Sequence, residues 1–485
     1  MKQAVAEEES TPWLALALVT ALAGALRLIG LDSELWYDEI LTVLESVRLP
    51  LSRIVTVFPG DNQHTFFSLL AHLSVGVFGE HPWSLRLPSV LLGVATVPLL
   101  YVFAREFVGR TEALLASLLL AVAYHHVWFS QSARGYAALA FFALLSSWLL
   151  LRGMRRRKPA DWVWYGVAAA LGVYTHLTMI FLVLSHALLC LTPLVPPRVE
   201  RKQPRPWRLL ILGFGLAAGF TLLLFAPVLL EVGQAVAGDS APMASATPRW
   251  AARELWRGLQ IGLGSGLAVL AGAALFLIGL WSYFRQSRFV VGMFLLPGVL
   301  TLAAAIALQR PVRPRFLFFL AGFALLIVVR GALELGRWLA HKRSPRPAEA
   351  PVAGLVLVGM MVLLSAAAVV VNSRYPKQAF EAAMRYVEAE RSEGEPVTTA
   401  GGARYPYRRY YRRPWESLES LEELQTIRAG GNRVWVVYTL KAYIANRTPD
   451  LLRTLSTECT AARVFRGTVG DGDITVCTAP PVPAP

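Results

Sequence analysis

Two adjacent carboxylates, Asp38 and Glu39, stand in the sequence LWYDE at 35–39, directly after the first long apolar segment. Acids flanked by aromatic residues at a membrane surface are costly to desolvate unless they have partners. One such carboxylate can act as a general base toward a hydroxyl group. The same residues also suit an interfacial aromatic belt with two solvated acids, because Trp and Tyr favour that depth. Composition alone leaves both interpretations open.

Cationic and polar residues that could meet an anion follow along the chain. Arg134 begins an otherwise apolar segment in FSQSARGY at 129–136, where it either anchors the helix or binds an anion and orients the acids. Arg310, Arg313 and Arg315 form a cluster with no acid nearby in sequence, and phosphate is the obvious ligand for such a cluster. His64, Arg86 and His176 are weaker candidates for the same anion.

Composition indicates an integral membrane protein. The 485 residues are 55% hydrophobic and only 16% charged, whereas soluble domains carry roughly 25% charged residues. The net charge of +15 comes largely from arginines in short loops between apolar segments, which is a topology signal and predicts no nucleic-acid partner. No zinc-type Cys/His spacing, P-loop or GxGxxG is present, which argues against a nucleotide-driven pump.

Eleven apolar segments of spanning length are predicted. They lie at about 12–30, 88–105, 111–129, 134–151, 161–177, 178–195, 209–230, 258–282, 289–308, 315–333 and 352–371. The basic clusters after every second segment place the N-terminus in the cytoplasm and the C-terminal part outside, in a bacterial cytoplasmic membrane. The apolar run at 65–78 is only about 14 residues long, so we expect it to lie along the outer surface.

Two regions lie beyond the predicted spans. A first outer loop covers 32–87 of the membrane domain (1–371), and residues 372–485 read as a small extracytoplasmic α/β domain. Cys459 and Cys477 flank a predicted hairpin, and whether they are bonded is left open. The Arg/Tyr tract at 404–413 suits anionic headgroups slightly better than a sugar or a lipid phosphate.

The chain resembles bacterial members of the family 39 glycosyltransferases, the protein O-mannosyltransferase-like enzymes of the membrane-embedded GT-C class. The resemblance covers most of the membrane region. It is carried by WYDE at 36–39, LRLPS at 85–89, the turn at 101–109, SQSARGY at 130–136 and YTH at 174–176. The acid pair and the Gln-x-x-Arg-x-Tyr element are fairly specific together, although neither is specific alone.

The resemblance implies an inverting transfer of a sugar from a polyprenyl-phosphate carrier to an acceptor outside the membrane. Asp38 matches the family's catalytic acid, which takes the proton of the acceptor, and Glu39 is its paired neighbour. His64 falls where the family often has a His or Lys before Pro-Pro, but Thr65-Phe66 replaces that pair here. Donor phosphate or substrate binding is predicted for His64, Arg86, Gln131, Arg134, Tyr136, His176, Arg313 and Arg315.

Other classes of function remain alternatives. A transporter or flippase of a lipid-linked or anionic substrate should carry ionisable residues near the membrane midplane, whereas here they gather toward one face. A non-catalytic scaffold or sensor would not need Asp38 and Glu39. The sequence does not name the sugar, or say whether the acceptor is a protein, a lipid or a glycan. No cofactor or metal site is predicted, although a divalent metal is compatible with the GT-C class.

Overall fold

The computed structural model describes residues 11–60, 63–200, 203–237, 248–310, 313–343 and 352–482. Helices dominate up to Asn372. They are α1 (Trp13–Leu28), α2 (Tyr37–Thr42), η1 (Val43–Val47), α3 (Leu51–Thr56), α4 (Thr65–Phe78), α5 (Pro82–Ala104), α6 (Arg110–Val122), α7 (Tyr124–Ser130), α8 (Tyr136–Arg156), α9 (Pro159–Thr175), α10 (Met179–Leu191), α11 (Trp207–Phe225), η2 (Ala226–Val228), α12 (Leu229–Ala237), α13 (Pro248–Leu263), α14 (Gly266–Gln286), α15 (Arg288–Ala307), η3 (Pro314–Leu320), α16 (Ala321–Arg343) and α17 (Val352–Asn372).

The protein is a multi-pass membrane protein, but the predicted count of eleven spans is not confirmed. In the described part of the chain, seven helices are long and apolar enough to cross a membrane, or eight if α6 and α7 form one span. The segment predicted at 111–129 bends by 58° between α6 and α7. The segment predicted at 258–282 is broken at Gly264, whose φ of +83° ends α13 before α14 begins.

Residues after α17 form a small α/β domain. Its elements are α18 (Phe380–Glu390), β1 (Val397–Gly401), η4 (Pro406–Tyr410), β2 (Glu416–Leu418), α19 (Leu421–Ala429), β3 (Val434–Thr439), α20 (Lys441–Arg447), α21 (Pro449–Thr457), β4 (Thr460–Phe465) and β5 (Ile474–Ala479). The strand order is β2-β1-β3-β5-β4. Strand β1 pairs in parallel with β2 and β3, whereas β5 pairs antiparallel with β3 and β4.

The predicted hairpin is present as β4 and β5, and a disulfide joins Cys459 to Cys477. The Arg/Tyr tract packs within the protein only in part. Tyr407 is fully buried, and the hydroxyl of Tyr405 donates to Glu45 in η1. Arg404, Arg408, Arg409 and Arg412 are exposed, so contact of the tract with lipid headgroups stays a prediction.

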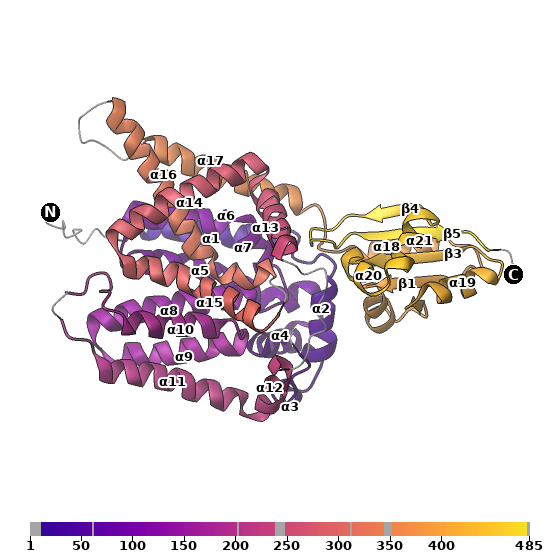
Figure 1. Cartoon of the computed structure of the whole chain (residues 1–485), viewed down its shortest axis with the longest axis horizontal. Coiled ribbons are helices and arrows are strands. Elements are labelled where there is room, and N and C mark those ends of the chain that lie inside the picture. Colours follow the sequence, from indigo (N-terminus) through magenta and orange to yellow (C-terminus); the bar gives the residue numbers. More distant parts are fainter. Residues whose placement is uncertain are drawn as a thin grey trace.

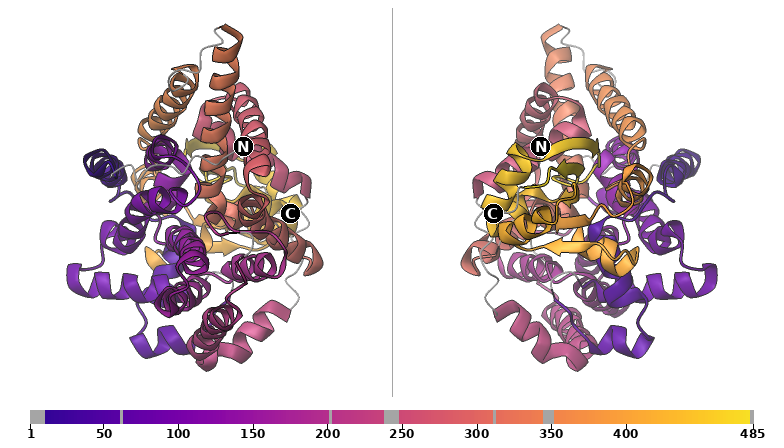
Figure 2. Two further views of the ribbon diagram at one scale, coloured as in Figure 1. Left: turned by 90° about the vertical axis from the view of Figure 1, so that its left-hand side faces the viewer. Right: turned by 90° about the vertical axis from the view of Figure 1, so that its right-hand side faces the viewer.

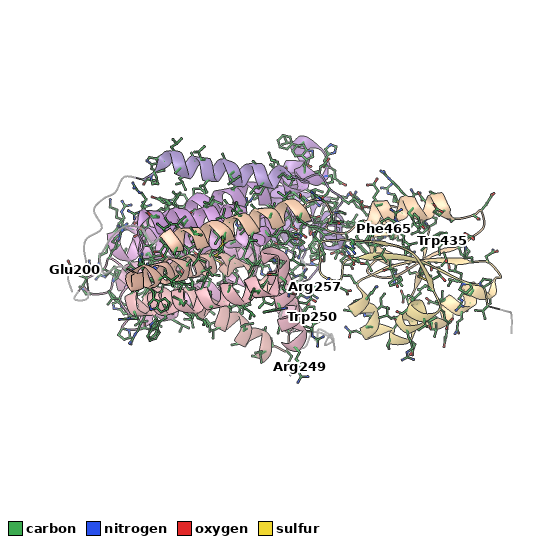
Figure 3. All side chains as sticks on the ribbon, turned by 90° about the horizontal axis from the view of Figure 1, so that it is seen from above. Glu200, Arg249, Trp250, Arg257, Trp435 and Phe465 are labelled. Carbon is green, nitrogen blue, oxygen red and sulfur yellow. A yellow bond between two sulfur atoms is a disulfide. The ribbon has the colours of Figure 1, made fainter. Side chains whose placement is uncertain are left out.

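The helical bundle and the α/β domain lie end to end (Figure 1). Several helices of the bundle run roughly along the long axis and are seen end-on when the molecule is turned by 90° (Figure 2). Figure 3 places Glu200 at the far end of the bundle, whereas Trp250 and Arg257 of α13 lie near the boundary with the α/β domain. Helix α2 also lies at that boundary (Figure 1).

The buried apolar side chains form several clusters, and one of these clusters crosses the boundary between the bundle and the α/β domain. The largest cluster of buried side chains belongs to the helical bundle. A second cluster joins residues of the segment 35–85 and Ala133 to residues of the α/β domain, among them Leu35, Ile40, Phe380 and Trp435. The short helices after α1 therefore share a core with the C-terminal domain, which holds α2 at the junction.

Candidate active site

Asp38 lies in the first turn of α2 and is only 9% exposed. Its Oδ2 atom is 2.7 Å from Nη1 of Arg315 and 3.9 Å from Nη2 of Arg134. Arg315 stands at the start of η3, and Arg134 directly precedes α8. Three segments that are far apart in sequence thus bring one carboxylate and two guanidinium groups together at one end of the bundle.

The charge balance around Asp38 keeps this carboxylate ionised. Burial by itself would raise the pKa of Asp38, but the positive charges of Arg315, Arg134 and Arg313 outweigh that effect and lower it. The three predicted arginines do not all converge, because Nη2 of Arg310 instead donates to the carbonyl of Ala235, 2.7 Å away. One carboxylate facing three arginines leaves a surplus of positive charge, which suits a phosphate.

His64, Tyr136 and His176 form an aromatic cluster beside Arg134. The ring of His64 lies 5.2 Å from that of Tyr136 and 5.0 Å from that of His176, and the Arg134 guanidinium lies 5.8 Å from the ring of Tyr136. Gly135 permits this approach, since a Cβ there would lie 2.8 Å from Nδ1 of His64. Four of the predicted binding residues therefore do lie together.

His64 is held as a neutral imidazole. Its Nδ1 lies 3.1 Å from the carbonyl oxygen of Thr175, so Nδ1 is the donor, and the buried Nε2 has no hydrogen-bond partner in the described part of the chain. Burial and the charge of Arg134 lower the pKa of His64 well below its usual value. Nε2 is then an acceptor, and it can donate to a phosphate only if the bound anion favours protonation.

Glu39 faces away from this cluster and is saturated. Its Oε1 accepts from Nε of Arg86 (2.9 Å) and from the amide of Ala133 (2.6 Å), and its Oε2 accepts from Nη2 of Arg86 (2.7 Å). Both side chains are 0% exposed. The guanidinium of Arg86 also donates to the backbone carbonyls of Leu31, Ser33 and Glu34. This bidentate pair fixes the entry to α2 and offers no free group to a substrate.

We predict that replacing Arg86 by Met destabilises the protein by about 3–5 kcal/mol, because Glu39 would stay buried without its bidentate partner. Thermal unfolding of the purified protein in detergent measures the effect. Arg48→Met is the control: its partner Glu80 is 31% exposed and Arg48 39% exposed, so the loss should stay below about 1 kcal/mol. Equal unfolding midpoints for both variants would contradict a structural role for Arg86.

Gln131 also has a structural position. Its amide nitrogen donates to the carbonyl oxygens of Arg27 (3.1 Å) and Ile29 (2.6 Å), which ties the end of α7 to the end of α1. Its own carbonyl accepts a hydrogen bond from Lys377. Of the residues predicted to bind the donor, Arg86 and Gln131 thus lie outside the cluster around Asp38.

Comparison with known proteins shows what parts of the chain are similar to. Residues 64–230 match the family model described as dolichyl-phosphate-mannose-protein mannosyltransferase. Two Bacillus subtilis (strain 168) proteins are similar over short stretches: "Putative mannosyltransferase YkcB", 37% identical over 86 residues (18% of this chain), and "Putative mannosyltransferase YycA", 36% identical over 95 residues (20% of this chain). The matches span only 12% and 13% of the lengths of those two relatives.

Solved structures resemble almost the whole chain. ArnT from Cupriavidus metallidurans in the apo state aligns with a TM-score of 0.55 at 14% identity, over 97% of this chain and 98% of that one. Archaeal oligosaccharyltransferase AglB from Archaeoglobus fulgidus aligns with a TM-score of 0.55 at 12% identity, over 96% and 74% of the two chains. The chain has the GT-C glycosyltransferase fold. The resemblance seen in the sequence is confirmed.

Within this GT-C fold the donor set around Asp38 does not fit a divalent metal. In the described ranges, no group of three or more His, Cys, Asp or Glu side chains lies close enough together to hold one. Glu39 is saturated by Arg86 and Ala133, and Asp38 faces arginines. A hard cation is held by carboxylate and other oxygen ligands, and the arginines beside Asp38 would repel it.

Sequence reasoning missed two residues at the back of the GT-C site. Lys377 and Gln378 follow α17 and are 6% and 0% exposed. Nζ of Lys377 lies 3.8 Å from Oε1 of Glu39, and Oε1 of Gln378 accepts the amide hydrogen of Tyr37 at 2.8 Å. A lysine beside a glutamine after the last apolar segment carries no local signal for such a role, because its partners lie more than 240 residues earlier.

Proposed function

We propose that this protein transfers a sugar from a polyprenyl-phosphate-linked donor to a hydroxyl-bearing acceptor, with inversion at the anomeric carbon. The observation that carries the proposal is the ionised, buried Asp38 held 2.7 Å from Arg315 and beside Arg134. One carboxylate base and a cationic phosphate site are the two groups that such a transfer needs.

The charges of the site complement the proposed transition state. Asp38 accepts the proton of the acceptor hydroxyl while the hydroxyl oxygen attacks the anomeric carbon of the sugar. The bond from that carbon to the phosphate oxygen breaks, and polyprenyl phosphate leaves with the electron pair. Arg315, Arg313 and Arg134 then face the negative charge that develops on the phosphate.

Donor binding also provides a way to release the base. Without donor, Arg315 binds Asp38. The phosphodiester of the donor carries a negative charge and accepts bidentate hydrogen bonds from guanidinium groups. The donor phosphate therefore competes for Arg315 and frees Oδ2 of Asp38 for the acceptor.

The remaining residues have supporting roles in this proposal. Glu39, Arg86 and Gln131 position α2 and neighbouring helix ends and do not contact the donor. Tyr136, His64 and His176 line the approach to Arg134. This assignment revises the donor-binding role expected for Arg86 and Gln131, and the catalytic role expected for Glu39.

Related structures support the substrate class without naming the substrate. ArnT from Cupriavidus metallidurans has been solved bound to undecaprenyl phosphate, with a TM-score of 0.50 and 16% identity to this chain. AglB has been solved with dolichol-phosphate and an inhibitory peptide. We place the protein in the cytoplasmic membrane with its N-terminus inside and the α/β domain (372–485) outside, where it meets the acceptor.

The proposal is tested by mass spectrometry of lipid-linked sugars and envelope glycans from cells that lack the gene. We expect a polyprenyl-phosphate sugar to accumulate and one glycan, lipid or protein to lose a sugar residue, both reversed by the wild-type gene. If neither pool changes and the membrane instead loses uptake or flipping of a lipid-linked substrate, a transporter becomes the better account.

A further inference from the structure

The segment 376–378, between α17 and α18, is attached to the turn of the β4–β5 hairpin. The carbonyl of Pro376 accepts the amide hydrogen of Thr468 at 3.0 Å, and the carbonyl of Lys377 accepts that of Val469 at 3.2 Å. The backbone packs closely there, since a Cβ on Gly467 would lie 2.3 Å from the carbonyl oxygen of Lys377. The α/β domain therefore fixes the backbone from which the Lys377 side chain extends.

The other side of the same segment contacts the helix that carries Asp38. Gln378 accepts the amide hydrogen of Tyr37 at 2.8 Å, which satisfies one of the free N–H groups in the first turn of α2. Nζ of Lys377 lies 3.8 Å from Oε1 of Glu39 and donates to the carbonyl of Gln131. One short segment thus reaches α2 and the end of α7 together.

Further contacts make this junction rigid. Nζ of Lys377 lies 5.0 Å from the ring centre of Trp128, whose Nε1 donates to the hydroxyl of Thr468 at 3.0 Å. Glu34, just before α2, accepts the amide hydrogen of Glu381 in the first turn of α18 at 2.6 Å. Together with the shared apolar core, these contacts join α2 and the segment before it to the α/β domain.

We propose that Lys377 is a positioning residue of the C-terminal domain: by holding Glu39 and the end of α7, it sets α2 so that Asp38 faces Arg315 and the acceptor. This inference rests on the proposed function, and it assigns the α/β domain a part in catalysis. Proximity and orientation are sensitive to displacements of about 1 Å, which cost on the order of 10²-fold in rate. Lys377 touches no substrate in this account.

The contact of Lys377 with Glu39 depends on pH, because it depends on the charge of Lys377. Burial, partly offset by Glu39 and reinforced by Arg86, lowers the pKa of Lys377 to about 7. Glu39 of α2 and Arg86 of α5 are the charged groups that act on it in the described chain, while Tyr124 and Tyr375 line the small cavity beside it. The attraction to Glu39 is therefore present below pH 7 and is lost as the pH rises through 7.

The folding stability and the transfer rate should change in opposite directions with pH. This difference distinguishes a positioning role of Lys377 from a role in folding. An unfolded lysine titrates near pH 10.4, so between about pH 7 and 10.4 the unfolded chain binds the proton that folded Lys377 has lost. This group's contribution to folding stability consequently rises with pH over the range in which we expect the transfer rate to fall. If Lys377 acted only on folding stability, the transfer rate would not fall over a pH range in which the stability rises.

The test uses the full-length protein in lipid nanodiscs, with the polyprenyl-phosphate sugar identified as donor. Lys377→Met should lower kcat about tenfold or more and change the donor KM less than about threefold, whereas Lys377→Arg, which stays charged, should recover most of the rate and keep it at pH 8.5. Lys441→Met, on the surface of the same domain, is the control and should match wild type. Hydrogen exchange of the amides of α2 is measured in parallel and should be at least fivefold faster in Lys377→Met.

Each outcome decides the proposal. Unchanged kcat and unchanged exchange of α2 in Lys377→Met would overturn it, as would equal losses in Lys377→Met and Lys441→Met. A wild-type rate that is flat from pH 6.5 to 8.5 would remove the charge-dependent part and with it the role of Glu39 as the anchor. If wild type transfers no sugar at all, the proposed function fails, and the exchange of α2 alone decides whether Lys377 holds the helix.

Discussion

Asp38→Asn is expected to lower the rate of sugar transfer by about 10³-fold, within the range of roughly 10²–10⁴ that a positioned general base contributes. Asparagine keeps the shape of the side chain and a hydrogen-bond acceptor toward Arg315, but it cannot take the proton of the acceptor hydroxyl. The measurement is the initial rate of transfer with saturating donor and acceptor, on protein purified from membranes at wild-type yield.

Binding of the donor should change in the other direction in the same variant. Without the Asp38 carboxylate, Arg315 and Arg134 have no anionic competitor in the site, so polyprenyl phosphate should bind at least as tightly as in wild type. Asp32→Asn is the matched control, because Asp32 is an exposed acid of the same loop. An Asp38→Asn enzyme with more than a tenth of the wild-type rate would show that Asp38 is not the base.

Arg315→Ala is expected to weaken binding of polyprenyl phosphate by about 100-fold. A hydrogen bond to a charged group contributes about 1.5–3 kcal/mol, and each 1.4 kcal/mol is a factor of ten in affinity. The same change leaves Arg134 and Arg313 as the positive neighbours of Asp38. We expect the donor KM to rise much more than the acceptor KM, and Arg313→Ala to show the same pattern with a smaller effect.

Arg337 provides a control for Arg315→Ala, because η3 and α16 together form one span that carries both arginines. Arg337 lies near the other end of α16, where it is 50% exposed and pairs with Glu334. Arg337→Ala should leave both donor affinity and rate at wild-type values. The measurement is displacement of a labelled polyprenyl phosphate by the unlabelled lipid. Equal donor affinities for wild type and Arg315→Ala would remove the phosphate site from the proposed function.

The different roles of Asp38 and Glu39 could not be derived from the sequence. Asp38 and Glu39 are adjacent, so composition and spacing treat them alike. In the helix their side chains point about 100° apart. Glu39 meets Arg86 and Ala133, and Asp38 meets Arg315. Only the packing of the helix ends shows that one acid is a structural anchor and the other is available for chemistry.

Several features were nevertheless accessible from local pattern. Blocks of apolar residues predicted the membrane helices, because spanning length and hydropathy are properties of a continuous segment. The α/β character of the C-terminal part follows from strand-like and helix-like runs of the same local kind. The motifs at 36–39 and 130–136 indicated a resemblance to the family, which the family-model match at 64–230 and the fold support.

Tertiary structure alone decided which charges meet. Arg315 reaches Asp38 across 277 positions of sequence, and Lys377 reaches Gln131 across 246. Such pairs depend on which helix ends lie at the same end of the bundle and how each helix is rotated, and neither quantity is encoded in a local window. The sequence by itself determined a membrane-embedded helical protein with an acidic motif beside its first span. The fold determined which residues that motif faces, because burial makes each charge stable only beside its partner.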